Sequence, residues 1–356
     1  MPAADRARGA LYGLAIGDAL GMPTQMLSRQ QITARWGPLL TGFEPAPPGH
    51  PIAAALPPGA VTDDTEQAVL LARMLVKGHG VLDPGDWAAA LISWERDMAE
   101  RGSLDLLGPS TKRALAAVLA GTPPEEAGQH GDTNGAAMRI PPVGIANAPT
   151  PDEQPPPDRE TGGPPALADR VTDIDGRPAL VDRVVEASRV THNTSVALAG
   201  AAAVAAAVSA GVGGASVATA IDAGVTAARL AARRGHWVAG ADVAARIRWA
   251  VGLVSDAGPD QAAELISTLV GTSLATQESV PAAFAVLSVV PDDPWQACLL
   301  AASLGGDTDT IAAMAGAIAG ACHGQSAFPP DAIATIDAHG FALPALADSL
   351  VALRSQ

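Results

Sequence analysis

The amino-acid sequence predicts an all-α protein, on two observations. Hydrophobic residues make up 48% of the 356 residues but aromatic residues only 3%. A core of this kind must be built from Ala, Leu and Val, which favours closely packed helices over a β-sandwich. Apolar residues also recur at helical spacing almost throughout the chain, and strand-like alternation is hard to find. We therefore expect about a dozen helices or more.

The individual helices are expected where apolar runs and start signals coincide. The clearest apolar runs at helical spacing begin at Val69, Leu115, Val243 and Leu265. An Asp or Gly directly before Pro marks a helix start, because Pro suits the first turn, where its missing N–H group is not needed. This signal occurs at Asp83-Pro84, Gly108-Pro109, Gly258-Pro259 and Asp293-Pro294.

Residues 193–221 carry no charge, so this stretch must be compared with a membrane span. It consists mainly of Ala, Ser, Thr, Val and Gly, and Gly211, Gly213 and Gly214 interrupt it. A spanning helix requires about 20 strongly apolar residues. We therefore expect buried core helices here and no membrane association. No secretory signal pattern opens the sequence, and we expect a cytoplasmic protein.

The charge and the cysteine content exclude several classes of function. The chain has 22 basic and 37 acidic residues, which gives a formal net charge of −15. This balance argues against a nucleic-acid or anionic-membrane partner held by bulk charge, but it leaves room for a local phosphate pocket. The two cysteines, Cys298 and Cys322, are too few for a disulfide framework or a thiolate zinc site.

Two Pro-rich segments lack the helical spacing of apolar residues that the rest of the chain shows. Residues 148–165 are rich in Pro, Gly and charge, a composition that buries too little apolar surface to offset ordering. We interpret them as a surface insertion within a single domain spanning 1–356, because similar helical patterning resumes afterwards; a linker between two domains is the alternative. Residues 44–58 lead into an acidic cluster, and loops of this length often border a functional site.

Two acidic clusters, TDDT at 62–65 and GGDTDT at 305–310, each precede a helical run. One interpretation is helix capping, with Asp63 and Asp307 as N-caps and Glu66 completing a capping box with Asp63. Capping uses one oxygen per helix, however, whereas each cluster offers two carboxylates and two hydroxyls. Adjacent carboxylates repel each other and are usually held together by a cation.

The alternative interpretation is a metal site. Four converging Asp carboxylates would form an all-oxygen site suited to Mg²⁺ or Mn²⁺ rather than zinc. Their charge suffices for two ions about 3.5–4 Å apart. The spacing along the chain does not show whether the two clusters converge.

Five motifs occur in order along the chain: GDALG at 17–21, TDDT at 62–65, TNGAAMR at 133–139, TH at 191–192 and GGDTDT at 305–310. Together they resemble the ADP-ribosylglycohydrolase family. The resemblance covers nearly the whole chain, from about residue 6 to residue 324. It implies a single compact domain of orthogonally packed helices with a binuclear Mg²⁺ centre in a cleft.

The resemblance also implies roles for individual residues. The implied metal ligands are Thr62, Asp63, Asp64, Asp307, Asp309 and Thr310. The implied substrate contacts are Asn134, Gly135, Met138, Arg139 and His192, with Gly305 and Gly306 letting the backbone approach metal and ligand. From the residues alone, Arg139 could equally be a surface cation, His192 a core histidine and Met138 a packing residue. Asp18 is expected to brace the first helix near the site.

Gln25 departs from the family pattern, which often has Glu at this position, in a mobile loop that reaches the scissile bond. Gln can form hydrogen bonds to substrate, but it cannot act as a general base. This difference argues against the family branch that depends on that Glu. The segment LLGPSTK at 106–112 instead resembles a branch whose substrate could be a smaller ribosyl glycoside.

We therefore expect a Mg²⁺-dependent hydrolase of a ribosyl glycosidic bond that removes ADP-ribose from a modified acceptor. Asp63 or Asp309 is the expected proton acceptor, and Mn²⁺ could replace Mg²⁺. One alternative is a nucleoside-type N-ribohydrolase that acts on a small ribosyl substrate. The other is a catalytically silent relative that binds ADP-ribose or has a structural role.

Overall fold

The computed structural model describes residues 1–100, 107–150 and 179–354. In these ranges the backbone forms helices and loops, and its strand-like contacts are two isolated bridges, Thr133–Ala275 and Thr194–His236. The all-α prediction is thus confirmed. The expected insertion at 148–165 lies almost entirely outside the described residues.

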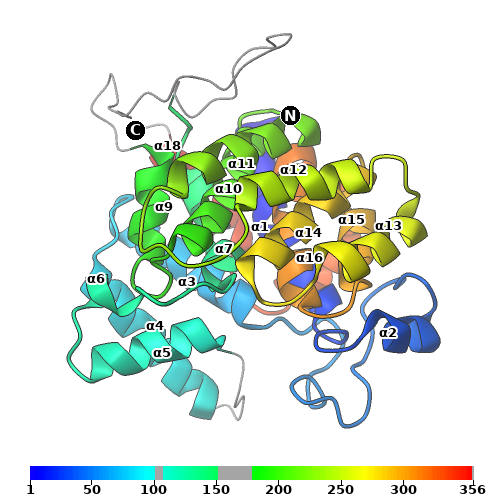
Figure 1. The fold of residues 1–356 in the computed structure, drawn as a ribbon, viewed down its shortest axis with the longest axis horizontal. Coiled ribbons are helices and arrows are strands. Elements are labelled where there is room, and N and C mark those ends of the chain that lie inside the picture. The colour runs from blue at the N-terminus through cyan, green and yellow to red at the C-terminus, as the bar shows by residue number, and fades with distance from the viewer. Residues whose placement is uncertain (101–106, 151–178, 355–356) are drawn as a thin grey trace.

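The first half of the described chain contains eight helices. In order they are α1 (Ala3–Gly21), α2 (Arg29–Trp36), α3 (Asp63–Lys77), α4 (Pro84–Glu100), α5 (Pro109–Leu119), α6 (Pro124–Ala127), α7 (Gly135–Arg139) and α8 (Pro141–Ala146). Figure 1 shows α2 on one flank of the molecule and α4, α5 and α6 on the other.

The second half supplies most of the core. Its helices are α9 (Leu180–Ser188), α10 (Ser195–Val212), α11 (Val217–Ala231), α12 (Val243–Leu253), α13 (Pro259–Leu265), the π-helix η2 (Ile266–Val270), α14 (Thr276–Val289), α15 (Pro294–Ala302), α16 (Thr308–His323), the 3-10 helix η3 (Gln325–Ala327), α17 (Pro330–Asp337) and α18 (Leu343–Arg354). All four helices expected from an Asp-Pro or Gly-Pro signal begin at that Pro. The apolar run from Leu265 differs from expectation, because it continues as the π-helix instead of an α-helix.

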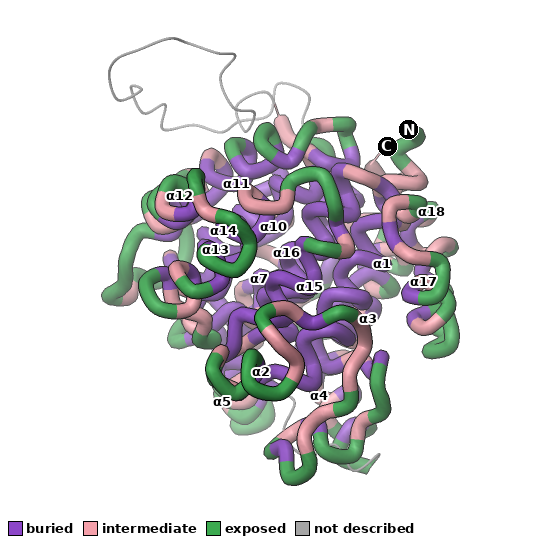
Figure 2. Tube along the Cα trace, turned by 90° about the vertical axis from the view of Figure 1, so that its right-hand side faces the viewer, coloured by how far each residue is buried: buried purple, intermediate pink, exposed green. Residues whose placement is uncertain are grey.

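Helix α10 forms the middle of the core. It is long and apolar enough to cross a membrane by length and composition, but 89% of it is buried inside the protein. Figure 2 shows buried backbone along α10, α15, α16 and α1, surrounded by exposed outer helices. This is the placement of a core helix, as the small-residue composition of 193–221 predicted.

Helix α1 packs along α16 through a stripe of glycines with a four-residue repeat. A Cβ atom added to any of these glycines would lie 2.0 to 2.4 Å from a backbone carbonyl oxygen of α16. The pairs, from one end to the other, are Gly9 with Gly320, Gly13 with Gly316, Gly17 with Ala312 and Gly21 with Thr308. Only glycine permits this approach, which brings the C-terminus of α1 against the N-terminus of α16.

Candidate functional site

The two acidic clusters converge on one cavity of about 400 Å³. Asp63 and Asp64 lie in the first turn of α3, and Asp309 and Thr310 lie in the first turn of α16. The Thr310 hydroxyl donates a hydrogen bond of 3.3 Å to Asp64 Oδ2, which joins the two clusters. The tertiary structure thus supplies the convergence that the sequence spacing left open.

Several other segments complete the wall of this cavity. Pro51 and Ile52 come from the Pro-rich loop 44–58, which therefore borders the site as expected. Thr111 and Lys112 come from the first turns of α5. The sequence-predicted residues in the lining are Gln25, Asp63, Asp64, Asn134, Gly135, Met138, Asp307, Asp309 and Thr310.

Asp18 of α1 caps the N-terminus of α3. Its carboxylate accepts hydrogen bonds from the backbone N–H and hydroxyl of Thr62, at 2.9 and 2.8 Å, and from those of Thr65, at 3.1 and 2.5 Å. The expected capping by Asp63 is wrong, because the N-cap residue is Thr62. Capping from a neighbouring helix leaves the Asp63 and Asp64 carboxylates available to the cavity.

The other two expected caps also differ from the structure. Asp307 is the N-cap residue of α16 by position, but its side chain makes no capping hydrogen bond. It accepts a 2.5 Å hydrogen bond from Asn134 Nδ2 instead. Glu66 does not complete a capping box with Asp63, since its carboxylate accepts from Trp94 Nε1 at 2.7 Å. The acidic residues therefore have other partners than the helix ends.

The buried carboxylates raise one another's pKa values. Burial is the main cause for all five, Asp18, Asp63, Asp64, Asp307 and Asp309. Repulsion from Asp309 further raises the pKa of Asp64, and repulsion from Asp307 further raises that of Asp309. The hydrogen bonds that Asp18 and Asp307 accept lower the pKa values of these two carboxyls and so offset part of the effect of burial.

The donor set fits oxygen-preferring divalent cations. Asp64 Oδ1 and Asp309 Oδ1 are buried and have no hydrogen-bond partner, a rare condition for buried carboxylate oxygens. The neighbouring groups are carboxylates and hydroxyls, the ligand types of Mg²⁺ and Mn²⁺. Within the described ranges no three Asp, Glu, His or Cys side chains are already arranged to hold a metal.

A buried chain of hydrogen bonds runs behind the cavity from Asp63. Gln67 Nε2 donates to Asp63 Oδ2 at 3.0 Å, and Gln67 Oε1 accepts from Arg139 Nη1 at 2.7 Å. Arg139 also donates to the Thr191 hydroxyl and lies over the Trp87 ring, 5.4 Å from its centroid. Arg139 therefore supports Asp63 through Gln67.

His192 continues this chain toward the cavity wall. Its Nδ1 lies 2.8 Å from the Thr191 hydroxyl, and its Nε2 lies 3.0 Å from the hydroxyl of Thr133, a lining residue. Thr191 accepts from Arg139, and its own hydrogen can be donated to Nδ1 in the tautomer that carries the His192 proton on Nε2. Burial, with Arg139 nearby, lowers the pKa of His192 well below its ordinary value.

The placement of Arg139 and His192 corrects their predicted role. Both side chains are buried, at 1% and 0% exposure, and neither belongs to the cavity lining, so direct substrate contact does not fit this geometry. Arg139 is no surface cation, and its pKa is lowered to about 10 by burial. Both residues instead hold lining residues in place. A Cβ atom added to Gly135 would lie 2.9 Å from His192 Cε1. This short distance explains why a residue without a side chain stands at this position.

Gly305 and Gly306 also lie outside the lining, and their contacts are with the chain itself. Both have positive φ, at 84° and 80°, a conformation that glycine adopts readily. Gly306 exchanges backbone hydrogen bonds with the segment after α1, donating to the Leu27 carbonyl at 2.9 Å and accepting from Met26 at 2.7 Å. These glycines were expected to let the backbone approach metal and ligand. In the structure they hold the Gln25 segment against the loop that leads into α16.

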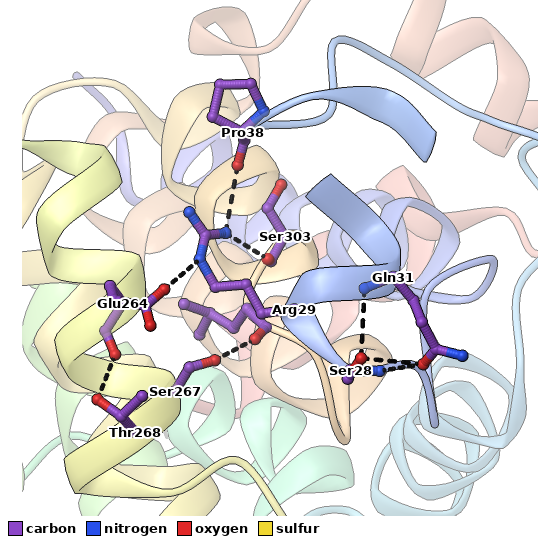
Figure 3. A network of polar contacts seen from close by, with 9 residues as sticks. Ser28, Arg29, Gln31, Pro38, Glu264, Ser267, Thr268 and Ser303 are labelled. Carbon is purple, nitrogen blue, oxygen red and sulfur yellow. Dashed lines mark hydrogen bonds and ion pairs between the residues drawn. The ribbon is translucent and has the colours of Figure 1, made fainter. Parts of the chain in front are cut away.

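Arg29 makes further contacts that hold the segment after α1 in place. Figure 3 shows its guanidinium between the carbonyl oxygens of Pro38 and Ser303, at 3.2 and 2.8 Å, and Glu264 at 3.5 Å. Ser28 and Gln31 form a capping box at the start of α2 beside it. These bonds keep the segment that carries Gln25 against the loop that leads into α16.

Sequence reasoning missed several contributors to the site. Asp18 was expected to support the site by capping or bracing the first helix; it does support the site, but by capping α3. Gln67 and Lys112 were not singled out, although Gln67 lies four residues after Asp63 on one helix face, a spacing that places the side chains together. The glycine repeat 9, 13, 17 and 21 was a further available signal for the α1–α16 contact.

Comparisons with known proteins place this chain in context. A family model described as ADP-ribosylglycohydrolase matches residues 1–356. The chain is similar to the uncharacterized protein YegU of Escherichia coli, at 36% identity over 94% of this chain and 92% of that protein. It is also similar to the ADP-ribosyl-dinitrogen reductase glycohydrolase of Rhodospirillum rubrum, at 33% identity over 40% of this chain and 45% of the relative.

A further relative and a solved structure agree with these matches. An ADP-ribosylarginine hydrolase of Serratia proteamaculans is 33% identical over 40% of this chain and 36% of its own length. A solved structure titled as an ADP-ribosylglycohydrolase-related protein complex superposes with a TM-score of 0.68 at 26% identity. That match covers 99% of this chain and 98% of the solved one.

Proposed function

From the premise that this chain belongs to the ADP-ribosylglycohydrolase family and is a hydrolase of glycosyl bonds, we propose that it removes ADP-ribose from a modified acceptor with the help of two Mg²⁺ ions. The observation that carries the proposal is the convergence of four lining carboxylates, two with unpartnered buried oxygens, on one cavity. The expected ligands remain Thr62, Asp63, Asp64, Asp307, Asp309 and Thr310. Bound there, the ions supply positive charge at the ribose and favour ionisation of water.

The protein's own groups define the rest of the reaction. Asp63 and Asp309 are the candidate proton acceptors, because both carboxylates line the cavity. Asn134 holds Asp307 in place through its 2.5 Å hydrogen bond. Gln25 lines the cavity and offers an amide N–H that has no partner among the described residues, so it can donate to substrate.

Lys112 supports an ADP-ribosyl substrate over an uncharged one. It is one of two lysines in the chain, and it lines a cavity otherwise rich in carboxylates. It lies in the first turns of α5, whose N-terminus begins at Gly108-Pro109 without a side-chain cap. A cation beside the positive end of a helix favours an anionic group, and the diphosphate of ADP-ribose is such a group.

The alternative is a nucleoside-type ribohydrolase. The cavity volume of about 400 Å³ lies toward the small end of the roughly 300–1,000 Å³ range of ligand pockets. This observation favours a smaller ribosyl substrate. Gln25 is compatible with both functions.

The test measures product release from a substrate panel. We expect wild-type protein to release ADP-ribose from an ADP-ribosylated protein or peptide in Mg²⁺ and not in EDTA, and Asp307→Ala with Asp309→Ala to be inactive. Each reaction is run beside adenosine and inosine as nucleoside substrates. Release of free base from nucleosides, with no ADP-ribose released, would replace the proposal with the alternative function.

A further inference from the structure

His50 connects two segments of the cavity wall. Its side chain is 6% exposed. Nε2 lies 2.8 Å from the backbone oxygen of Gln25, in the turn after α1. Nδ1 accepts hydrogen bonds from the backbone N–H groups of Ile52 and Ala53, at 3.2 and 2.8 Å. The ring therefore bridges the Gln25 turn and the Pro-rich loop.

These contacts determine the tautomer. A backbone N–H group can only donate, so Nδ1 must be the acceptor and carry no hydrogen. The proton is then on Nε2, where it is donated to the Gln25 carbonyl. A neutral ring in this single tautomer satisfies all three contacts, whereas a protonated ring would lose both bonds to Nδ1.

Both segments joined by His50 face the cavity. Gln25 lines it on one side of the bridge, and Pro51 and Ile52 line it on the other. The Gln25 side chain is 6% exposed, and its Nε2 has no hydrogen-bond partner. A buried, unpartnered donor in a cavity is costly unless a ligand accepts from it. Its position therefore matters for ligand recognition.

We infer that His50 is a positioning residue, which holds the Gln25 amide and the Pro51–Ile52 wall in the arrangement that accepts the substrate. It touches no reacting atom and acts through the Gln25 backbone. The inference rests on the proposed function for its kinetic readout, since the substrate that Gln25 contacts is an ADP-ribosyl group in that proposal. The hydrogen-bond bridge itself is a separate statement and has a separate readout.

Two half-isosteres separate the two ends of the bridge. His50→Asn keeps an acceptor at the position of Nδ1 and loses the Nε2 donor, so the Pro-rich loop retains its bonds and the Gln25 turn is released. His50→Gln keeps a donor near the position of Nε2 and loses the Nδ1 acceptor. His339→Asn is the matched control, because His339 Nε2 also contacts a backbone carbonyl, that of Gly59 at 2.9 Å, outside the cavity lining.

The kinetic test is a double-mutant cycle with Gln25→Ala, measuring kcat and KM for release of ADP-ribose. We expect His50→Asn to lower kcat/KM about five- to tenfold, mainly through a higher KM, as fits one misplaced hydrogen bond. In the Gln25→Ala background the same substitution should change kcat/KM less than about twofold. An equal loss in both backgrounds would overturn the inference, because a merely structural role is additive. His339→Asn should leave kcat/KM unchanged.

Amide hydrogen exchange tests the bridge without turnover. In His50→Asn the exchange of residues 22–27 should accelerate while that of residues 51–53 stays as in wild type; His50→Gln should show the reverse. Unchanged exchange of both segments in both variants contradicts the bridge. Absence of ADP-ribose release by wild-type protein contradicts the proposed function instead, and the exchange result then stands alone.

Discussion

Gln25 shows how a single residue limits the chemistry that this site can perform. Its backbone is held by His50 and its amide nitrogen lies unpartnered in the cavity. An amide can donate or accept a hydrogen bond, but it cannot take up a proton at neutral pH. The proposed function therefore assigns proton transfer to Asp63 or Asp309 and substrate recognition to Gln25.

Substitution of Gln25 distinguishes recognition from catalysis. Gln25→Ala should lower kcat/KM about tenfold or less, because one neutral hydrogen bond worth about 1 kcal/mol is lost. Gln25→Glu places a carboxylate where the family pattern often has one, and we expect increased cleavage of O-linked adducts. Steady-state kinetics on N-linked and O-linked ADP-ribosyl substrates measures both effects. A thousandfold loss in Gln25→Ala would show that Gln25 is catalytic.

Lys112 provides a residue-scale test of the substrate class. Lys112→Ala should raise KM for an ADP-ribosyl substrate about tenfold, since a charge-assisted contact to phosphate is worth about 1.5 kcal/mol. It should leave the reaction with an uncharged nucleoside unchanged. Lys77→Ala is the control, because Lys77 lies in the last turn of α3 and is absent from the lining. Equal effects on both substrates would argue against a phosphate contact.

At the scale of elements, the α1–α16 contact places the carboxylates. The glycine repeat lets the two backbones touch, so the C-terminus of α1 meets the N-terminus of α16 at Gly21 and Thr308. Asp18, one turn earlier on α1, then caps α3. One helix thus aligns the two helix starts that carry the acidic clusters.

Gly13→Ala tests this contact away from the cavity. An added Cβ would lie 2.0 Å from the Gly316 carbonyl oxygen, and we expect the free energy of unfolding to fall by about 3 kcal/mol, the upper part of the overpacking range. Gly252→Ala in α12 is the matched control, because nothing lies within 4 Å of the added Cβ. It should be neutral or stabilising by up to about 1 kcal/mol. Urea unfolding midpoints measure both, and equal midpoints would contradict the close contact.

At the scale of the whole molecule, stability is coupled to pH through the buried carboxylates. A carboxyl whose folded pKa is raised above the ordinary 3.8 retains its proton in the folded state after the unfolded chain has lost it. The free energy of unfolding of the metal-free protein should therefore decrease as the pH rises from about 4 through the raised pKa values.

Mg²⁺ should reverse this trend, because metal binding requires ionised carboxylates. We expect the rise in Tm on adding millimolar Mg²⁺ to EDTA-treated protein to be larger at about pH 8 than at about pH 5. The comparison with and without metal at each pH removes the contribution of His192, whose lowered pKa acts in the opposite direction below 6.5. Asp307→Ala with Asp309→Ala should abolish the rise. If the Tm does not change on adding Mg²⁺ at either pH, the result contradicts a metal centre.

The helical class, the helix starts at Pro84, Pro109, Pro259 and Pro294, and the residue types of the site could all be predicted from the sequence. These features depend on local spacing and composition, which are readable along a chain. The small-residue composition of residues 193–221 likewise predicted a buried helix, and α10 is one.

The packing of the helices determines which polar side chains face the cavity and which support it from behind, and the sequence did not predict this division. Asp63 and Asp64 are free of helix capping because Asp18, 45 residues before Asp63 in the sequence, accepts from the N-terminus of α3. Arg139 belongs to a motif whose other members include four lining residues, yet its side chain, like that of His192, turns into a buried chain of hydrogen bonds. Such partnerships join residues from different helices, and the physical reason that sequence cannot show them is that they depend on how the helices pack.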